Sequence, residues 1–314
     1  MSDVTIVMYH YVRNLQRSRY PDIKGLNVSE FKNQLDYLND RYNFVTVNQC
    51  IQHIYHGSKN FPENAMLLTF DDGYKEHYNE VFPILEARGI QGAFFPPVKA
   101  IMEHKVLDVN KIHFVLASTD KPSELVDTIN QKISELSREH ALKDPEFYAN
   151  KLSDTEHRYD PPEVVYVKRM LQRELPDIPR KIILDDLFNE YVDVDEKVFA
   201  KELYMSVDQI KCMLRHGMFI GGHGFSHKWL NAMDAEEQEF EVDKTKEFLS
   251  TLGVSTDKWV MCYPYGAYDE RLIEILKQKD CALGIGTEVG VAELAKENAF
   301  DLNRMDTNDF PKRS

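Results

Sequence analysis

LLTFDDGY, at residues 67–74, is an apolar run that ends abruptly in two adjacent carboxylates and a glycine. A strand with two acids at its end suffers desolvation and mutual repulsion, which a bound divalent cation commonly offsets. Because side chains alternate along a strand, one acid can ligate a metal while its neighbour moves a proton. Asp71 or Asp72 could instead cap the next helix, so other parts of the chain must decide between the two interpretations.

A second motif, GGHGFSH at residues 221–227, also follows a predicted strand and carries two histidines four residues apart. Such a pair can turn both imidazoles to one point, and one added carboxylate gives a three-ligand site that leaves positions open for water and substrate. Taken alone, the pair could equally be surface histidines. Together with the acids at another strand end, it predicts that Asp72, His223 and His227 bind one divalent metal. Zinc suits this donor set, and iron, cobalt, nickel and manganese are alternatives.

A third strand-end motif is YPYG at residues 263–266. The proline fixes the backbone and removes one amide, and the glycine permits a tight turn. This arrangement can point the amide of Tyr265 toward a metal, where it would stabilise an oxyanion. An ordinary turn explains the same tetrapeptide.

Apolar runs alternate with helical patterns in two parts of the chain, which is typical of an α/β fold with a parallel sheet or barrel. We expect a helix capped by Ser29 and another over residues 76–87 that ends at Gly89. The last clear strand is expected at residues 281–285. Cys50, Cys212 and Cys281 are interpreted as buried, small apolar side chains, because their spacing suits neither a metal site nor a disulfide framework.

The middle of the chain differs from its flanks, because charged helical patterns at residues 123–136, 163–175 and 181–191 are separated by prolines. We expect residues 1–99 and 206–314 to form the α/β body, and residues 100–205 to form a helical insertion. This insertion could cover the site or mediate homo-oligomerisation.

Composition excludes several classes of protein. The 314 residues carry a net charge of −14, which argues against binding nucleic acid. A hydrophobic content of 43%, with 17 Phe and 16 Tyr, predicts a large, aromatic-rich core. The first residues lack a basic and apolar leader, and no stretch approaches the ~20 apolar residues of a transmembrane helix. We therefore expect a cytoplasmic protein with no transmembrane segment.

The three motifs, in this order, resemble those of the polysaccharide deacetylase family, also called the NodB-homology domain or carbohydrate esterase family 4. The resemblance implies a distorted (β/α)7 barrel with its site at the carboxyl ends of the strands. It also implies metal-dependent N-deacetylation of an acetamido sugar. Asp71 would be the general base, Asp72, His223 and His227 would hold the metal, and the Tyr265 amide would stabilise the oxyanion.

Two positions depart from the family pattern. Cys262 stands where many members have an arginine that pairs with the catalytic aspartate. Without that cation the pKa of Asp71 would be lowered less, unless Arg304 or the metal supplies the positive charge. The usual histidine near the C-terminus, the general acid of the family, is absent, and His10 is the candidate substitute. The alternative for His10 is a structural, hydrogen-bonded histidine. Tyr74, Pro264 and Arg304 are the candidate substrate-binding residues.

The leading hypothesis is an N-deacetylase. Because a leader is not evident, its substrate is expected to be a lipid- or nucleotide-linked glycan precursor in surface polysaccharide assembly. A deformylase or another amide hydrolase could use the same site. Two alternatives are not enzymes: a non-catalytic glycan-binding protein that keeps the fold, and an interaction protein built around the helical insertion.

Overall fold

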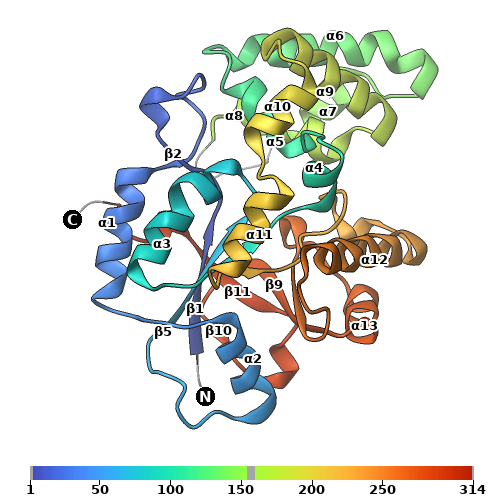
Figure 1. The fold of residues 1–314 in the computed structure, drawn as a ribbon. Coiled ribbons are helices and arrows are strands. Elements are labelled where there is room, and N and C mark those ends of the chain that lie inside the picture. The colour runs from blue at the N-terminus through green and yellow to red at the C-terminus, as the bar shows by residue number, and fades with distance from the viewer. Residues whose placement is uncertain (1–2, 154–159, 313–314) are drawn as a thin grey trace. The chain divides into compact units, whose positions relative to one another are not determined.

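The computed structural model describes residues 3–153 and 160–312 (Figure 1). The chain forms two compact units. The first contains Met1–Asn14, Gly25–Lys105 and Ala200–Ser314, and the second contains Leu15–Lys24 and Val106–Phe199. Among the described residues, no helix combines the length and apolar character needed to cross a membrane.

Parallel strands form the centre of the first unit (Figure 1). Within the described residues, seven of them follow one another in the order β7 (Phe219–Ile220), β6 (Gly92–Phe95), β5 (Ala65–Asp71), β1 (Asp3–Tyr9), β11 (Leu302–Asp306), β9 (Cys281–Val289) and β8 (Trp259–Cys262). Beyond β7, Gly222 pairs in parallel with Met261 of β8 and thereby joins the two ends of this order. The predicted distorted (β/α)7 barrel is therefore confirmed.

Strand β5 lies in the middle of the sheet between β1 and β6, and all seven of its residues are buried. Its register with β1 runs from the pair Val4–Ala65 to the pair Tyr9–Phe70. A parallel strand covered on both faces tolerates a nearly continuous apolar sequence, as residues 65–70 have. The two acids at residues 71 and 72 therefore lie at the carboxyl end of the strand, and both are still buried.

Three short pairings extend this framework. Strand β4 (Asn43–Phe44) pairs in parallel with the start of β5, and β10 (Ala292–Glu293) pairs antiparallel with the start of β1. Strands β2 (Val12–Arg13) and β3 (Leu26–Asn27) form a separate parallel pair.

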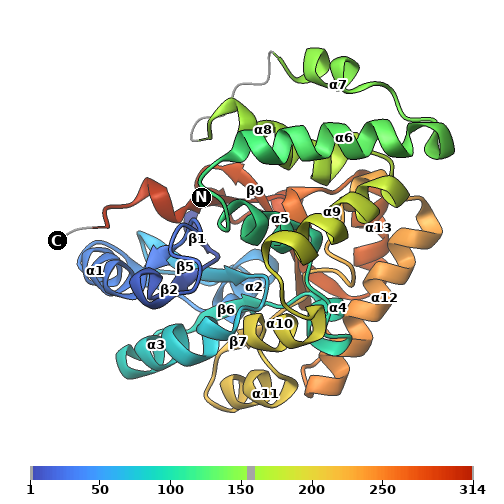
Figure 2. The same cartoon turned by 90° about the horizontal axis from the view of Figure 1, so that it is seen from above.

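Helices of the first unit surround the strands (Figure 2). They are α1 (Val28–Asn39), α2 (Val47–His56), α3 (Phe82–Arg88), α4 (Val98–Met102), α11 (Val207–Arg215), α12 (Ala235–Leu252) and α13 (Glu270–Gln278). The predicted cap of α1 is wrong. Asn27, not Ser29, is the N-cap, because the Glu30 carboxylate reaches back to the Asn27 amide at 3.0 Å.

The second unit is helical. It contains α5 (Asp108–Leu116), α6 (Pro122–His140), α7 (Pro145–Leu152), α8 (Pro162–Arg169) and α9 (Asp177–Tyr191), while α10 (Glu196–Leu203) begins in this unit and ends in the first. The segment Leu15–Lys24 belongs here because the Tyr20 ring packs edge-on against Phe114, with ring centroids 4.9 Å apart. The buried Lys111 ammonium lies 2.5 Å from Asp185 and 3.0 Å from Glu196, which neutralises it.

Other local expectations are also corrected. Strand β9 is longer than predicted and is not the last strand, since β10 and β11 follow it. A π-helical turn at His77–Val81 replaces the first half of the helix expected at residues 76–87. Pro179 lies within α9 and does not precede it. It occupies the first turn, where backbone N–H groups have no partner inside the helix, so its missing N–H costs no hydrogen bond. Cys212 is half-buried rather than fully buried.

Candidate functional site

The carboxyl ends of three strands and the middle of a fourth supply the candidate site. Asp71 ends β5 and Asp72 follows it, His223 and His227 lie in the loop after β7, Cys262 ends β8, and Arg304 lies on β11. Because the strands are parallel, their carboxyl ends meet at one rim of the barrel. The local sequence explains the exit from β5: Asp72 and Gly73 have φ angles of 70° and 66°, and this left-handed turn redirects the chain.

Asp72, His223 and His227 converge on one point. The Nε2 atoms of His223 and His227 lie 3.5 Å and 3.1 Å from Oδ1 of Asp72, and the three side chains are 3 to 6% exposed. Neither contact has hydrogen-bond geometry, so within the described residues this buried oxygen has no hydrogen-bond donor. A buried carboxylate oxygen without a donor and two ring nitrogens that face it suit a divalent cation. The residues therefore fit the metal that the sequence predicts.

Neighbouring groups orient these three side chains. Nδ1 of His223 lies 2.7 Å from the Cys262 carbonyl oxygen, so it carries the proton and leaves Nε2 free to ligate. The Tyr74 hydroxyl donates to Oδ2 of Asp72 at 2.6 Å. Burial alone would raise the pKa of Asp72, but the charge of His227 and the contacts of both histidines hold that pKa well below its ordinary value.

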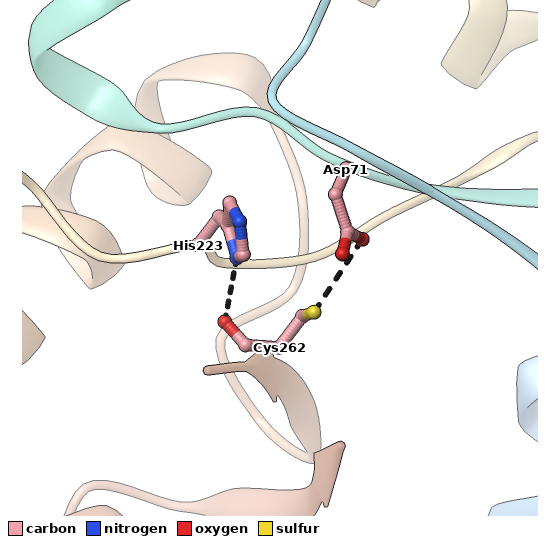
Figure 3. A group of neighbouring side chains, drawn as sticks. All are labelled: Asp71, His223 and Cys262. Carbon is pink, nitrogen blue, oxygen red and sulfur yellow. Dashed lines mark hydrogen bonds between the residues drawn. The ribbon is translucent and has the colours of Figure 1, made fainter. Parts of the chain in front are cut away.

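Asp71 has a different set of partners. Oδ2 lies 2.8 Å from Nη1 of Arg304, and the two side chains are 2% and 1% exposed. The Cys262 thiol donates to Oδ1 at 3.4 Å (Figure 3). Burial would raise the pKa of Asp71, but the Arg304 guanidinium outweighs it and holds the pKa below its usual value. Asp71 is therefore ionised at neutral pH, as a general base must be.

A second group of potential ligands, Asp71, His223 and Cys262, also lies within metal-binding reach (Figure 3). Arg304 already pairs with Asp71, and a second cation there would meet electrostatic repulsion. Burial raises the pKa of the Cys262 thiol, which keeps it protonated and a poor ligand. The three-residue group around Asp72 is consequently the better metal site.

His10 and Tyr265 lie beside these groups. His10 directly follows β1, whose last residue Tyr9 pairs with Phe70 of β5, and a positive charge on its imidazole would lower the pKa of both Asp71 and Asp72. The His10 carbonyl accepts a hydrogen bond from Nε2 of His77 at 2.8 Å, which fixes the backbone there. The Tyr265 ring packs against His227, with centroids 4.9 Å apart, and its φ angle is 58°.

The candidate substrate-binding residues have other contacts. Tyr74 and Arg304 are 0% and 1% exposed, and they hold the Asp72 and Asp71 carboxylates respectively. Pro264 is buried, and its ring packs closely against Gly224, since a Cβ added at that glycine would lie 3.5 Å from the ring. Pro264 therefore supports the loop at residues 223–227, called the histidine loop below. These contacts favour roles in holding the site over direct contact with substrate.

Sequence reasoning missed two groups at this rim. His77 belongs to no motif in the sequence, and it lies in a π-helical turn that the hydrophobic periodicity does not predict. Glu241 is one of several acids in α12, yet it is 3% exposed and its carboxylate contacts the histidine loop. Only tertiary packing distinguishes it from its exposed neighbours.

Comparisons with known proteins match this architecture. The family model described as polysaccharide deacetylase matches residues 58–139 and 188–283, more than half of the chain. Over 64 residues the chain is 41% identical to a poly-beta-1,6-N-acetyl-D-glucosamine N-deacetylase of Escherichia coli (strain K12). That stretch is 20% of this chain and 9% of the relative. Over 109 residues it is 26% identical to the putative polysaccharide deacetylase YxkH of Bacillus subtilis (strain 168), which is 35% of this chain and 38% of the relative.

Solved structures share the fold over almost the full length. The Streptococcus pyogenes deacetylase PplD in complex with acetate has a TM-score of 0.56 at 16% identity, covering 97% of this chain and 92% of that one. IcaB from Ammonifex degensii has a TM-score of 0.53 at 18% identity, covering 98% and 92%. At these identities the likeness establishes the fold.

Proposed function

The chain belongs to the polysaccharide deacetylase family, and on that premise we propose that it is a metal-dependent hydrolase that removes the N-acetyl group of an acetamido sugar. One observation carries this proposal: the adjacent acids Asp71 and Asp72 contact different kinds of side chain. Asp72 faces two histidine nitrogens, as a metal ligand would, and Asp71 faces an arginine, as an ionised base would. Amide hydrolysis with an activated water needs both functions at one place.

Each residue then has a distinct task. A divalent cation held by Asp72, His223 and His227, with zinc as the proposed ion, would acidify a water molecule and polarise the amide carbonyl. Asp71 takes the proton of the attacking water, and Arg304 keeps the carboxylate ionised for that purpose.

The remaining steps use two further groups. The Tyr265 amide donates to the oxyanion that develops on the amide carbonyl, and its support is the position of the residue beside His227. His10 protonates the departing amine, and its support is its position directly after β1, the strand that pairs with β5 up to Phe70, the residue before Asp71. The Cys262 thiol contacts one oxygen of Asp71 and carries no charge, whereas the Arg304 guanidinium reaches the other oxygen from β11.

The proposed substrate is an N-acetylated glycan or its lipid- or nucleotide-linked precursor in surface polysaccharide assembly. The Escherichia coli relative, named for deacetylation of poly-beta-1,6-N-acetyl-D-glucosamine, supports a glucosamine-containing glycan. The buried Asp71–Arg304 pair favours an active enzyme over a non-catalytic glycan-binding relative, because metal binding alone needs no second, separately neutralised carboxylate.

The test is acetate release from N-acetylglucosamine oligomers and from UDP-N-acetylglucosamine, with formylated analogues in parallel. Protein stripped of metal would be reconstituted with zinc, and Asp71→Asn would be compared with the exposed-residue control Asp36→Asn. We expect zinc-dependent acetate release that Asp71→Asn abolishes and Asp36→Asn retains. Formate release without acetate release would redirect the assignment to a deformylase. Activity that persists in Asp71→Asn would refute the assigned base.

A further inference from the structure

We propose that Glu241 is a positioning residue that holds the histidine loop, residues 223–227, in its metal-binding conformation. The inference rests on the proposed function in that it takes His223 and His227 as ligands. Glu241 projects from α12, lies outside all three sequence motifs, and is 3% exposed. A carboxylate buried to this degree requires compensation, and its partners show what it does.

Three groups at the centre of the loop donate hydrogen bonds to the Glu241 carboxylate. Oε2 accepts the backbone N–H of Phe225 at 2.7 Å and that of Ser226 at 3.0 Å. Oε1 accepts the Ser226 hydroxyl. Hydrogen bonds to an ionised acceptor are shorter and stronger than neutral ones, so one side chain fixes two successive peptide groups. These peptide groups lie between the two histidines.

The loop backbone needs such fixation. Gly224 has a φ angle of 70° and His227 has one of 55°. A left-handed conformation is unfavourable for a histidine and persists only where the surroundings impose it. Two successive N–H groups that follow a left-handed glycine form a concave anion site, and the Glu241 carboxylate fills it. The anion that shapes this loop therefore comes from the protein itself.

The opposite side of the loop is held as well. The carbonyl oxygens of Gly224 and Phe225 accept from the first amides of α4, Val98 at 3.1 Å and Lys99 at 2.9 Å. Glu241 thus holds the loop through its N–H groups and α4 holds it through its carbonyls. Neither contact involves a histidine ring, so both imidazoles remain available to the metal.

Residues of α12 one turn apart position the whole segment. Thr245 donates to the Glu241 carbonyl at 2.7 Å, and its methyl group packs against Gly222, the residue before His223. A Cβ at Gly222 would lie 2.3 Å from this methyl group, so helix and strand end are in close contact. Helix α12 consequently contacts the start of the loop through Thr245 and the centre of the loop through Glu241.

The test is the affinity of the metal-stripped protein for Zn²⁺ alone, measured by competition with a chromogenic chelator. Glu241→Met keeps the length of the side chain but removes both acceptors, and we expect its affinity to fall about 10- to 100-fold. Glu241→Gln retains an oxygen for the two N–H groups and an amide that can donate to the Ser226 hydroxyl, so we expect less than a threefold loss. Glu239→Gln removes a charge from an exposed position of the same helix and should bind Zn²⁺ as the wild type does.

Folding is followed by circular dichroism, and acetate release by the wild type is measured in parallel. Equal Zn²⁺ affinity in Glu241→Met and the wild type would overturn the inference and leave the proposed function intact. If Glu241→Met does not fold, Ser226→Ala replaces it, and the inference then requires weaker Zn²⁺ binding in that folded variant. Tight Zn²⁺ binding that weakens in Glu241→Met, without acetate release by the wild type, would sustain the inference and reject the deacetylase. A wild type that binds no Zn²⁺ would overturn both.

Discussion

Replacing Arg304 with methionine should destabilise the protein strongly, because it leaves Asp71 as a buried, unpaired anion. The two side chains are 1% and 2% exposed and their charged atoms lie 2.8 Å apart. Breaking a buried ion pair by removing one partner costs about 3–5 kcal/mol. An adjacent arginine lowers an aspartate pKa by about 1–3 units, or about 1.4–4 kcal/mol, so both routes give the same order.

Urea unfolding at pH 7, followed by circular dichroism, measures this loss. Arg88→Met is the matched control, because Arg88 pairs with Asp36 on the surface and such pairs contribute about 0–1 kcal/mol. The double variant Arg304→Met/Asp71→Asn should recover part of the stability, since the orphaned charge is gone. A loss in Arg304→Met no larger than that in Arg88→Met would refute the reasoning.

The same substitution predicts a pH dependence with a definite sign. In the wild type the pKa of Asp71 is lowered on folding, so its contribution to stability is present above the unfolded pKa and is lost as the pH falls through the folded pKa. Without Arg304, burial dominates and the pKa of Asp71 rises. The stability difference between wild type and variant should therefore be largest near neutral pH and shrink as the pH falls. In acetate release, the acid limb of kcat/KM should move to higher pH by about 1–3 units.

Three further changes probe separate parts of the account. His10→Ala should lower kcat for acetate release about 10²- to 10⁴-fold and leave Zn²⁺ affinity unchanged, and a parallel loss of affinity would contradict a proton-transfer role. Tyr74→Phe should weaken Zn²⁺ binding about tenfold in a chelator competition, because Asp72 loses its 2.6 Å hydrogen bond; unchanged affinity would deny Tyr74 that role. Gly222→Ala should lower the free energy of unfolding by about 1–3 kcal/mol in urea, because its Cβ would lie 2.3 Å from the Thr245 methyl group. A neutral effect there would mean that the close contact relaxes freely.

The fold was largely predictable because its strands are short apolar runs bounded by turn residues. The pattern of β5 and the acids after it stands out in the sequence, since a strand buried on both faces has few polar positions. Strand β11 was not predicted, because LNRMD has no apolar run and no alternation that periodicity detects. Its pairing with β1 and β9 depends on tertiary context.

Because β11 is not predicted from the sequence, the position of Arg304 in the site is not predicted either. Arg304 was identified as one possible source of positive charge for Asp71, but its place on a strand next to β1 was not foreseen. The motifs containing Asp72, His223 and His227 were recognisable because the chemistry dictates residue type and spacing. Supporting groups such as Glu241 have no such constraint, because any segment that packs against the loop can supply a carboxylate.

The most direct test of the central claim is a metal titration of activity. Zinc would be added stepwise to stripped protein while acetate release from an N-acetylglucosamine oligomer is measured. The account predicts that the rate rises in proportion to zinc and stops rising at one ion per chain, and that His223→Ala abolishes the rise. Full activity in the stripped protein, or an undiminished rise in His223→Ala, would contradict it.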